Sequence, residues 1–196
     1  SIPFTTLFGF WLLKSERPLV RLPLFWAGLL CALGGFVLMF EQGFGTDSTS
    51  ARGMGLLLGF AVSWGIYVVF VRRNLSEYPV HLSYGLVSLL TFPPLLALMV
   101  GLGDWHALLH FPPDQWGWLI LSALIGLTLS HVLYYRAILT LGPIASEGGM
   151  LLLPFQTALL AHFFLDERLA GTQWTAGAVM ILGCAMLIRA RITARE

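Results

Sequence analysis

Residues 80–102 read VHLSYGLVSLLTFPPLLALMVGL and contain no Asp, Glu, Lys or Arg. A helix that crosses the hydrocarbon core of a bilayer needs about 20 predominantly apolar residues, so this stretch predicts a membrane span. Its apolar residues would cover every side of a helix, whereas the strands of a membrane barrel alternate over about ten residues. The stretch therefore indicates a helical membrane protein rather than a barrel.

Similar apolar runs fill the rest of the chain, and short polar breaks separate them. The expected spans are a partial one at residues 1–13 and complete ones at about 22–40, 53–71, 80–102, 116–141, 143–165 and 172–188. Because the breaks are short, neighbouring helices should run antiparallel. The pattern predicts an all-α polytopic membrane protein with seven spans, of which the first is partial.

The composition of the 196 residues also indicates a membrane environment, because 57% of them are hydrophobic and only 11% are charged. A soluble domain carries about 25% charged residues, which form the polar surface that this chain lacks. The net charge of +1 leaves no basic surface for a nucleic acid. We therefore expect the lipid bilayer, and no nucleic acid, as a partner; these patterns do not specify an oligomeric state.

The basic residues divide unequally between the two sets of breaks. Nine of the eleven Lys and Arg residues lie in alternate breaks, whereas the other breaks contain only Arg52 and Arg168. Basic residues favour the cytoplasmic side of a membrane. The first set of breaks, and with it the C-terminus, is therefore predicted to be cytoplasmic.

Two segments of the chain repeat each other. The matching residues are Pro3, Phe4, Thr6, Glu16 and Arg17 against Pro154, Phe155, Thr157, Glu167 and Arg168, then Ala27, Gly28, Leu33, Gly34 and Leu38 against Ala176, Gly177, Leu182, Gly183 and Leu187. The basic residues place the first Glu-Arg loop inside and the second outside, so the repeats are predicted to be inverted. Inverted repeats are typical of secondary transporters. The alternative is an old duplication that was retained for packing.

The second copy of the repeat carries a series of short motifs. They are Tyr134-Tyr135, Leu-Gly-Pro-Ile-Ala at 141–145, Leu-Pro-Phe at 153–155, Asp-Glu-Arg-Leu at 166–169, Gly177 and Gly183. In order and spacing, these motifs resemble the EamA-like domain of the drug/metabolite transporter superfamily. By this resemblance, residues 1–41 are the end of a first EamA-like repeat and residues 53–190 are a complete second one.

The resemblance implies a ten-helix permease with both ends in the cytoplasm, of which this chain would hold helices four to ten. It also implies export or uptake of small organic metabolites, such as amino acids or drug-like compounds, by alternating access. The expected location is the bacterial cytoplasmic (inner) membrane. Many relatives have an acid just before the central proline, where this chain has Leu153. A proton-coupling carboxylate is therefore absent from that position.

Polar and aromatic side chains within the spans are candidates for contact with a substrate, because polar groups at bilayer depth usually face protein or a water-filled cavity. His131 lies near the middle of the fifth run, and we expect it to line the substrate path with Tyr134 or Tyr135. The alternative is a neutral histidine that a neighbouring helix satisfies. Trp64 and Tyr67 share one helix face, where they either stack on a substrate or serve packing and lipid contact.

A proline in the sixth run predicts a second part of the site. Pro154 cannot donate to the helix ladder, so it should kink the helix and free a backbone carbonyl for a ligand. Gln156 and Thr157 lie just beyond it and are expected to bind substrate, with helix curvature for packing as the alternative. Arg136 and Glu147 flank a cytoplasmic turn, where Arg136 either extends to the membrane surface or pairs with Glu147. Such a pair would form either a gate or a structural contact.

The fourth break contains residues with the spacing of metal ligands. His106 and His110 are four residues apart, with Asp104 and Asp114 nearby. Apolar residues interleave with them, so a short helix lying in the outer membrane interface explains the segment better. We therefore expect no metal and no cofactor.

These observations together favour a secondary transporter of small organic molecules. No Walker motif is present, so the energy must come from a gradient or from the substrate itself. No Asp, Glu, Lys or Arg is expected deep within a span, which favours a neutral, zwitterionic or aromatic substrate. We expect no catalytic residues; an intramembrane enzyme and a non-transporting membrane scaffold are the alternatives.

Overall fold

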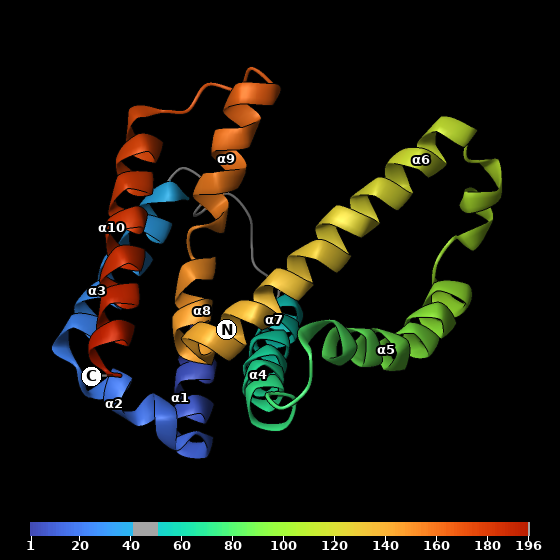
Figure 1. Cartoon of the computed structure of the whole chain (residues 1–196). Coiled ribbons are helices and arrows are strands. Elements are labelled where there is room, and N and C mark those ends of the chain that lie inside the picture. Colours follow the sequence, from blue (N-terminus) through green and yellow to red (C-terminus); the bar gives the residue numbers. More distant parts are fainter. Residues whose placement is uncertain (41–50, 196) are drawn as a thin grey trace.

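The computed structural model describes residues 1–40 and 51–195, and every regular element in this part of the chain is helical. The longer helices are α1 (Ile2–Leu12), α3 (Pro23–Met39), α4 (Ala51–Asn74), α5 (Val80–Leu102), α6 (Pro113–Ser122), α7 (Ser130–Leu141), α8 (Pro143–Met150), α9 (Leu153–Phe164) and α10 (Gly171–Thr193). Shorter elements are η1 (Lys14–Glu16), α2 (Arg17–Arg21), η3 (Trp105–His110) and the π-helix η4 (Ala123–Leu129). Figure 1 shows their arrangement.

Five helical stretches are long and apolar enough to cross a membrane. Two of them combine several elements: residues 113–141 comprise α6, η4 and α7, and residues 143–164 comprise α8 and α9. A sixth span results if residues 14–21 and 23–39, which meet at 78°, are counted together, and α1 is a shorter apolar helix. The prediction of an all-α polytopic membrane protein is confirmed.

The seven predicted runs correspond to helices whose ends differ from the predicted ones by a few residues. The largest difference at the C-terminal end is in α10, which was predicted to end at Ile188 and continues to Thr193. This last turn carries Arg191, a residue that is only 3% exposed. A helix can continue through charged residues when one of them is held by a partner inside the protein, as described below.

Helices α3 and α10 pack against each other in opposite directions, so that Gly28 lies beside Leu187 and Gly35 beside Met180. Their backbones approach so closely that a Cβ atom on Gly183 would lie 2.4 Å from the backbone nitrogen of Ala32. Small residues permit such close contact between membrane helices. This pair forms one side of the molecule (Figure 1).

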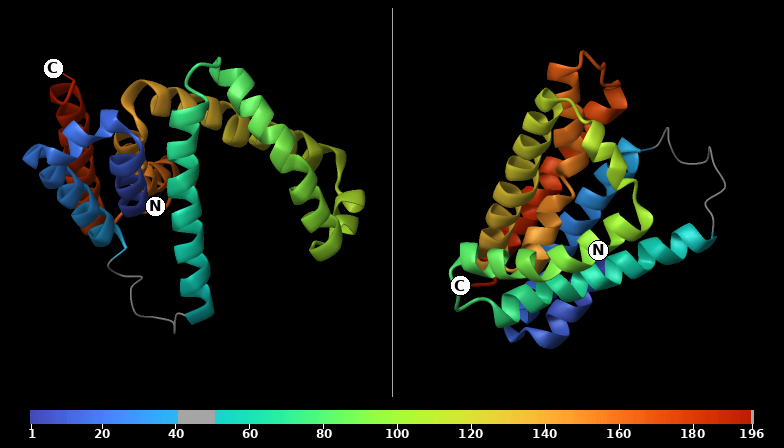
Figure 2. Two further views of the ribbon diagram at one scale, coloured as in Figure 1. Left: turned by 90° about the horizontal axis from the view of Figure 1, so that it is seen from below. Right: turned by 90° about the vertical axis from the view of Figure 1, so that its right-hand side faces the viewer.

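Helix α1 packs against α4 and α8, and α7 joins α8 to α5. Figure 1 and the left view in Figure 2 show α5 and α6 projecting away from the body that contains α1, α3, α8, α9 and α10. Helix α5 packs mainly against α7. As a result, α4, α5 and α7 enclose a space from three sides, and this space holds the candidate site.

The sixth span is interrupted in its middle. Helix α8 ends at Met150, residues 151 and 152 form a turn, and α9 begins at Leu153 with Pro154 in its first turn. Proline is well suited to the first turn of a helix, because its missing N–H would have no partner there. The interruption therefore lies just before the proline that was expected to kink this span.

Candidate functional site

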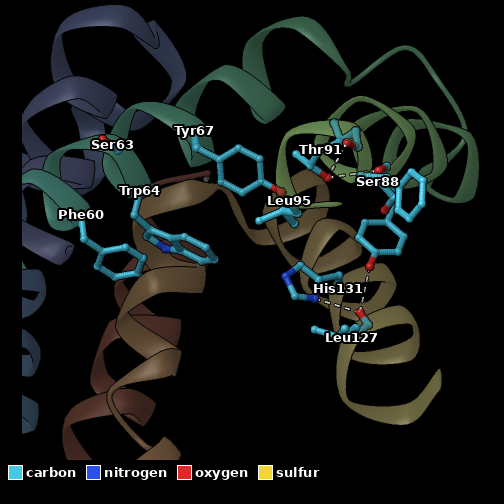
Figure 3. A pocket seen from close by; sticks show the side chains of 12 residues that line it. Phe60, Ser63, Trp64, Tyr67, Ser88, Thr91, Leu95, Leu127 and His131 are labelled. Atoms are coloured by element: carbon cyan, nitrogen blue, oxygen red, sulfur yellow. Dashed lines mark hydrogen bonds between the residues drawn. The ribbon is translucent and has the colours of Figure 1, made fainter. Parts of the chain in front are cut away.

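A cavity of about 520 Å³ lies between α4, α5, η4 and α7. We call it the aromatic cavity. Its lining consists mainly of aromatic and apolar side chains, with the hydroxyl groups of two serines, one threonine and two tyrosines: Phe60, Ser63, Trp64, Tyr67, Tyr84, Val87, Ser88, Thr91, Phe92, Leu95, Leu127 and His131. Figure 3 shows Trp64 and Tyr67 projecting from α4 and His131 from α7 around the same space. A concave apolar site with a few polar groups is the usual form of a small-molecule site.

His131 is held in the wall of the aromatic cavity by two neighbours. Its Nδ1 lies 2.8 Å from the carbonyl oxygen of Leu127, and its ring stacks on Tyr84 with the ring centroids 5.4 Å apart. A carbonyl only accepts hydrogen bonds, so Nδ1 is the donor, and a neutral imidazole then has Nε2 as an acceptor. His131 lies two residues after the end of η4, and π-helical turns occur frequently at functional sites.

The two tyrosines of α7 lie behind the cavity wall and contact Tyr67 and Trp64, which line the cavity. The hydroxyl groups of Tyr67 and Tyr135 lie 2.7 Å apart, and Tyr135 is completely buried. The ring of Tyr134 stacks on Trp64 at a centroid distance of 6.0 Å. The structure therefore brings together five of the residues predicted to bind substrate: Trp64, Tyr67, His131, Tyr134 and Tyr135.

The structure places Gln156 and Thr157 elsewhere. Both side chains are exposed on α9, and Thr157 lines a separate cavity of about 520 Å³ together with Pro154 and Met39. His131 does not line that cavity. The two parts of the predicted site therefore occupy different cavities, because the turn at residues 151–152 sets α9 apart from α8.

Glu147 of α8 was expected beside a cytoplasmic turn, but the structure shows it buried. Its side chain is buried, with 1% of the residue exposed, inside the stretch 143–164. Oε1 accepts hydrogen bonds from Trp64 Nε1 at 2.9 Å and from the Tyr134 hydroxyl, and Oε2 accepts one from Ser1 Oγ at 2.7 Å. Among the described residues Glu147 forms no ion pair with Arg136, and Arg136 is exposed, as in the alternative that it extends to the surface.

Glu147 lies only four residues from the start of the stretch 143–164, so it is buried by protein near one end of that span. Glu147 is near a predicted turn in sequence, but α1, α4 and α7 surround this end of α8 and exclude solvent from it. Its neighbours Gly148 and Gly149 were a usable signal, because a Glu among small residues in an apolar run suggests close packing. Tyr84 was also missed, and it carried no sequence signal beyond its place within a span.

A buried ion pair lies at the start of α8. Arg191 Nη2 of α10 lies 2.9 Å from Glu16 Oε1 of η1, and the two side chains are 4% and 0% exposed. Arg191 Nη1 also donates to the carbonyl oxygen of Ser15 at 3.2 Å. The pair rests against Gly142, the turn between α7 and α8, which has a φ of +93° and no room for a side chain. Both charged residues lie outside the predicted spans, in breaks that were predicted to be cytoplasmic.

The histidines with metal-like spacing lie far from this arrangement in the fold. His106 and His110 belong to η3, and His106 Nδ1 is 4.0 Å from Asp104 Oδ1, with both side chains well exposed. Within residues 1–40 and 51–195, no group of three potential metal-ligating side chains comes together. Glu147 and its three hydrogen-bond donors lie next to the aromatic cavity, because one of these donors, Trp64, also lines that cavity.

Comparison with known proteins identifies one family. Residues 51–189 match the EamA-like transporter family, a range that contains α4 to α10 almost completely and the whole aromatic cavity. No curated protein and no solved structure gives a significant match. The family match therefore covers well over half of the chain and all residues of the aromatic cavity.

Proposed function

This chain belongs to the EamA-like transporter family, and from that premise we propose that it carries small organic metabolites across a membrane by alternating access. The substrates of this proposal are amino acids or drug-like compounds. The observation that carries it is the aromatic cavity, which lies among membrane-spanning helices of the matched region. Members of this family are membrane transporters of the drug/metabolite superfamily rather than enzymes.

The proposed substrate site is the aromatic cavity. Trp64 and Tyr67 offer ring faces on which an aromatic or aliphatic substrate can stack, and His131 offers a hydrogen-bonding edge. The hydroxyl pair of Tyr67 and Tyr135 fixes the orientation of the Tyr67 ring. A site of this kind selects its substrate by shape and by a small number of polar contacts.

The alternating-access part of the proposal rests on the repeat. Residues 1–41 are proposed to end a first EamA-like repeat, and residues 53–190 to form a second one. The antiparallel packing of α3 on α10, which are corresponding helices of the two copies, supports an inverted relation between them. In such transporters one repeat rocks against the other around a site at their interface.

We expect replacement of His131 by Leu to lower the apparent substrate affinity about three- to tenfold. The variant removes one hydrogen-bonding edge, and a hydrogen bond contributes about 0.5–1.5 kcal/mol. The measurement is counterflow of labelled amino acids and drug-like compounds into liposomes that contain the full-length protein. His81→Leu, at an exposed position in α5, is the matched control. Unchanged transport by His131→Leu would remove His131 from the site.

The same counterflow assay tests the function itself. A transporter gives saturable exchange of at least one labelled compound, whereas a scaffold or an intramembrane enzyme gives none. Absence of saturable flux for every candidate compound would contradict the proposal.

The proposed location is the bacterial cytoplasmic membrane with the C-terminus in the cytoplasm, as the distribution of Lys and Arg suggests. A green fluorescent protein fused after Arg195 should therefore fluoresce, and alkaline phosphatase at the same point should be inactive. The same reporters inserted between residues 103 and 112 should give the opposite result. An active phosphatase at the C-terminus would reverse the proposed orientation.

A further inference from the structure

We infer that a groove between α1 and α3 binds an anionic phospholipid of the surrounding membrane. The groove has a volume of about 580 Å³, and its walls are mainly apolar side chains of α1 and α3, with Val20 from α2. We call it the α1–α3 groove. The inference goes beyond the proposed function, because it concerns the membrane around the protein rather than the transported substrate.

The α1–α3 groove has the shape that an acyl chain requires. It opens on the outside of the described chain, since Trp11 and Leu30 in its walls are 68% and 67% exposed. Along α1 it extends from Pro3 to Trp11, which is about 12 Å of helix. Lipid tails are as apolar as leucine side chains, so apolar contact alone does not select one lipid from the bilayer. Selection has to come from polar groups at the groove.

The segment that connects α1 to α3 supplies positive charge at one end of the groove. Residues 14–21, which form η1 and α2, meet α3 at 78° and lie at the lower end of the molecule in Figure 1. They include Lys14, Arg17 and Arg21. The acid of this segment, Glu16, is paired with Arg191 and its side chain is 0% exposed. The segment therefore presents a basic surface to the headgroup of a lipid in the groove.

Arg17 lies at the rim of the groove. Its Nε donates to the carbonyl oxygen of Phe10 at 3.1 Å, and its guanidinium carbon is 5.9 Å from the centre of the Phe10 ring, which lines the groove. Its Nη2 donates to the carbonyl oxygen of Trp11 at 3.4 Å. Within the described residues these contacts use two of the five N–H groups of the guanidinium, so the others can bind a phosphate oxygen.

Thr6 provides a hydroxyl group inside the groove. The residue is 8% exposed, and its Oγ1 is buried without a hydrogen-bond partner in residues 1–40 and 51–195. A buried hydroxyl group without a partner is unfavourable. Thr6 lies one helical turn from Phe10, which is about 6 Å along α1. A lipid whose phosphate contacts Arg17 brings an ester carbonyl to this depth, where the Thr6 hydroxyl can donate to it.

The second copy of the repeat has a corresponding cavity with a different charge. Thr6 corresponds to Thr157, which lines a cavity of about 520 Å³ together with Pro154 and Glu167. The adjoining segment, residues 165–170, contains two acids and one base. An anionic headgroup is therefore favoured beside α1 and disfavoured beside α9. In the proposed orientation the basic side faces the cytoplasmic leaflet, whose anionic lipids attract basic segments.

The test measures lipid binding to the purified full-length protein by native mass spectrometry, with dioleoyl phosphatidylglycerol and dioleoyl phosphatidylcholine as probes. These lipids have the same acyl chains and differ in net charge. We expect wild-type protein to bind phosphatidylglycerol at least tenfold more tightly. Arg17→Gln should weaken this binding at least fivefold and leave phosphatidylcholine unaffected. Arg73→Gln, the same change at an exposed position in the last turn of α4, is the control and should behave as wild type.

Two variants test the walls of the groove. Leu30→Trp fills the groove without changing the charge and should weaken phosphatidylglycerol binding at least fivefold. Leu56→Trp is its control, because Leu56 on α4 is 69% exposed and lies outside the lining of the groove. Thr6→Val keeps the shape of the side chain but removes the hydroxyl group, and should weaken binding about threefold.

A further variant keeps the inference testable if Arg17→Gln fails to fold. Lys14→Gln with Arg21→Gln removes two exposed charges while Arg17 keeps its contacts with α1, and should also weaken phosphatidylglycerol binding. Equal binding of the two lipids by wild-type protein would overturn the inference. So would unchanged phosphatidylglycerol binding in both charge variants or in Leu30→Trp, or a lipid-free oligomer in which a second copy covers the groove.

These outcomes are independent of transport. Saturable counterflow in a protein without preference for phosphatidylglycerol would support the transporter and remove the lipid site. Selective lipid binding without flux of any compound would support the lipid site and contradict transport.

Discussion

Replacement of Glu16 by Gln is expected to lower the free energy of unfolding by about 3–5 kcal/mol, because it leaves the Arg191 guanidinium buried without its counter-charge. The two side chains are almost fully inaccessible, and Nη2 lies 2.9 Å from Oε1. They connect η1 to α10 against the α7–α8 turn at Gly142. Loss of the pair should therefore loosen three segments that are distant in sequence.

Thermal unfolding in detergent, followed by size-exclusion chromatography of the heated samples, measures this change. The double variant Glu16→Gln with Arg191→Met removes both charges and should recover part of the loss, since well-packed neutral residues often replace a buried ion pair at little cost. Glu77→Gln is the exposed control. A single variant as stable as wild type, or a double variant less stable than the single one, would contradict the claim that Glu16 compensates the buried charge of Arg191.

The second large effect is expected at Gly183, where α10 touches α3. A Cβ atom there would lie 2.4 Å from the backbone nitrogen and 2.8 Å from the Cβ of Ala32. Because a backbone atom cannot move aside as a flexible side chain can, Gly183→Ala should separate the helices. Overpacking costs about 1–3 kcal/mol, and the backbone contact places this variant at the upper end of that range.

Gly34→Ala provides a matched control on the other helix of the pair. A Cβ atom on Gly34 meets no atom within 4 Å, so this change introduces no clash. Both variants gain about 1 kcal/mol of helix propensity, and the difference between their melting temperatures therefore isolates the clash. Equal melting temperatures would show that α3 and α10 can move apart freely.

The two glycine positions also bear on the repeat. Gly34 and Gly183 are equivalent in the two copies, yet Gly183 is in tight contact and Gly34 faces open space. On α3, the close contacts with α10 are made by Gly28 and Gly35. Equivalent residues of a repeat thus have different surroundings, and the contact between the copies cannot be read from their alignment.

Some of the predicted site residues lie together in the structure, and others do not. Trp64, Tyr67 and His131 were predicted because polar and aromatic groups within spans are conspicuous, and all three line one cavity. Gln156 and Thr157 were grouped with them by proximity to Pro154, but α9 directs them elsewhere. Distance along a helix predicts shared faces, but it does not predict which helices meet.

The burial of Glu147 and Glu16 likewise could not be predicted from the sequence around them. Both lie near turns of the sequence, where a charge is ordinarily exposed to water, and both are buried. Their burial depends on contacts with segments far away in the chain: Ser1 and Trp64 for Glu147, and Arg191 for Glu16. No local pattern encodes such contacts.

The amino-acid sequence was sufficient for the helical spans, their approximate ends and the family, because these depend on local hydrophobicity and on short motifs. Apolar runs of this length have one stable form in a bilayer, which is the helix with its internal hydrogen bonds. The partners of each helix, the aromatic cavity and the burial of Glu147 followed from the assembled fold. They depend on close packing between distant segments, where a single glycine or hydroxyl group decides how two helices fit together.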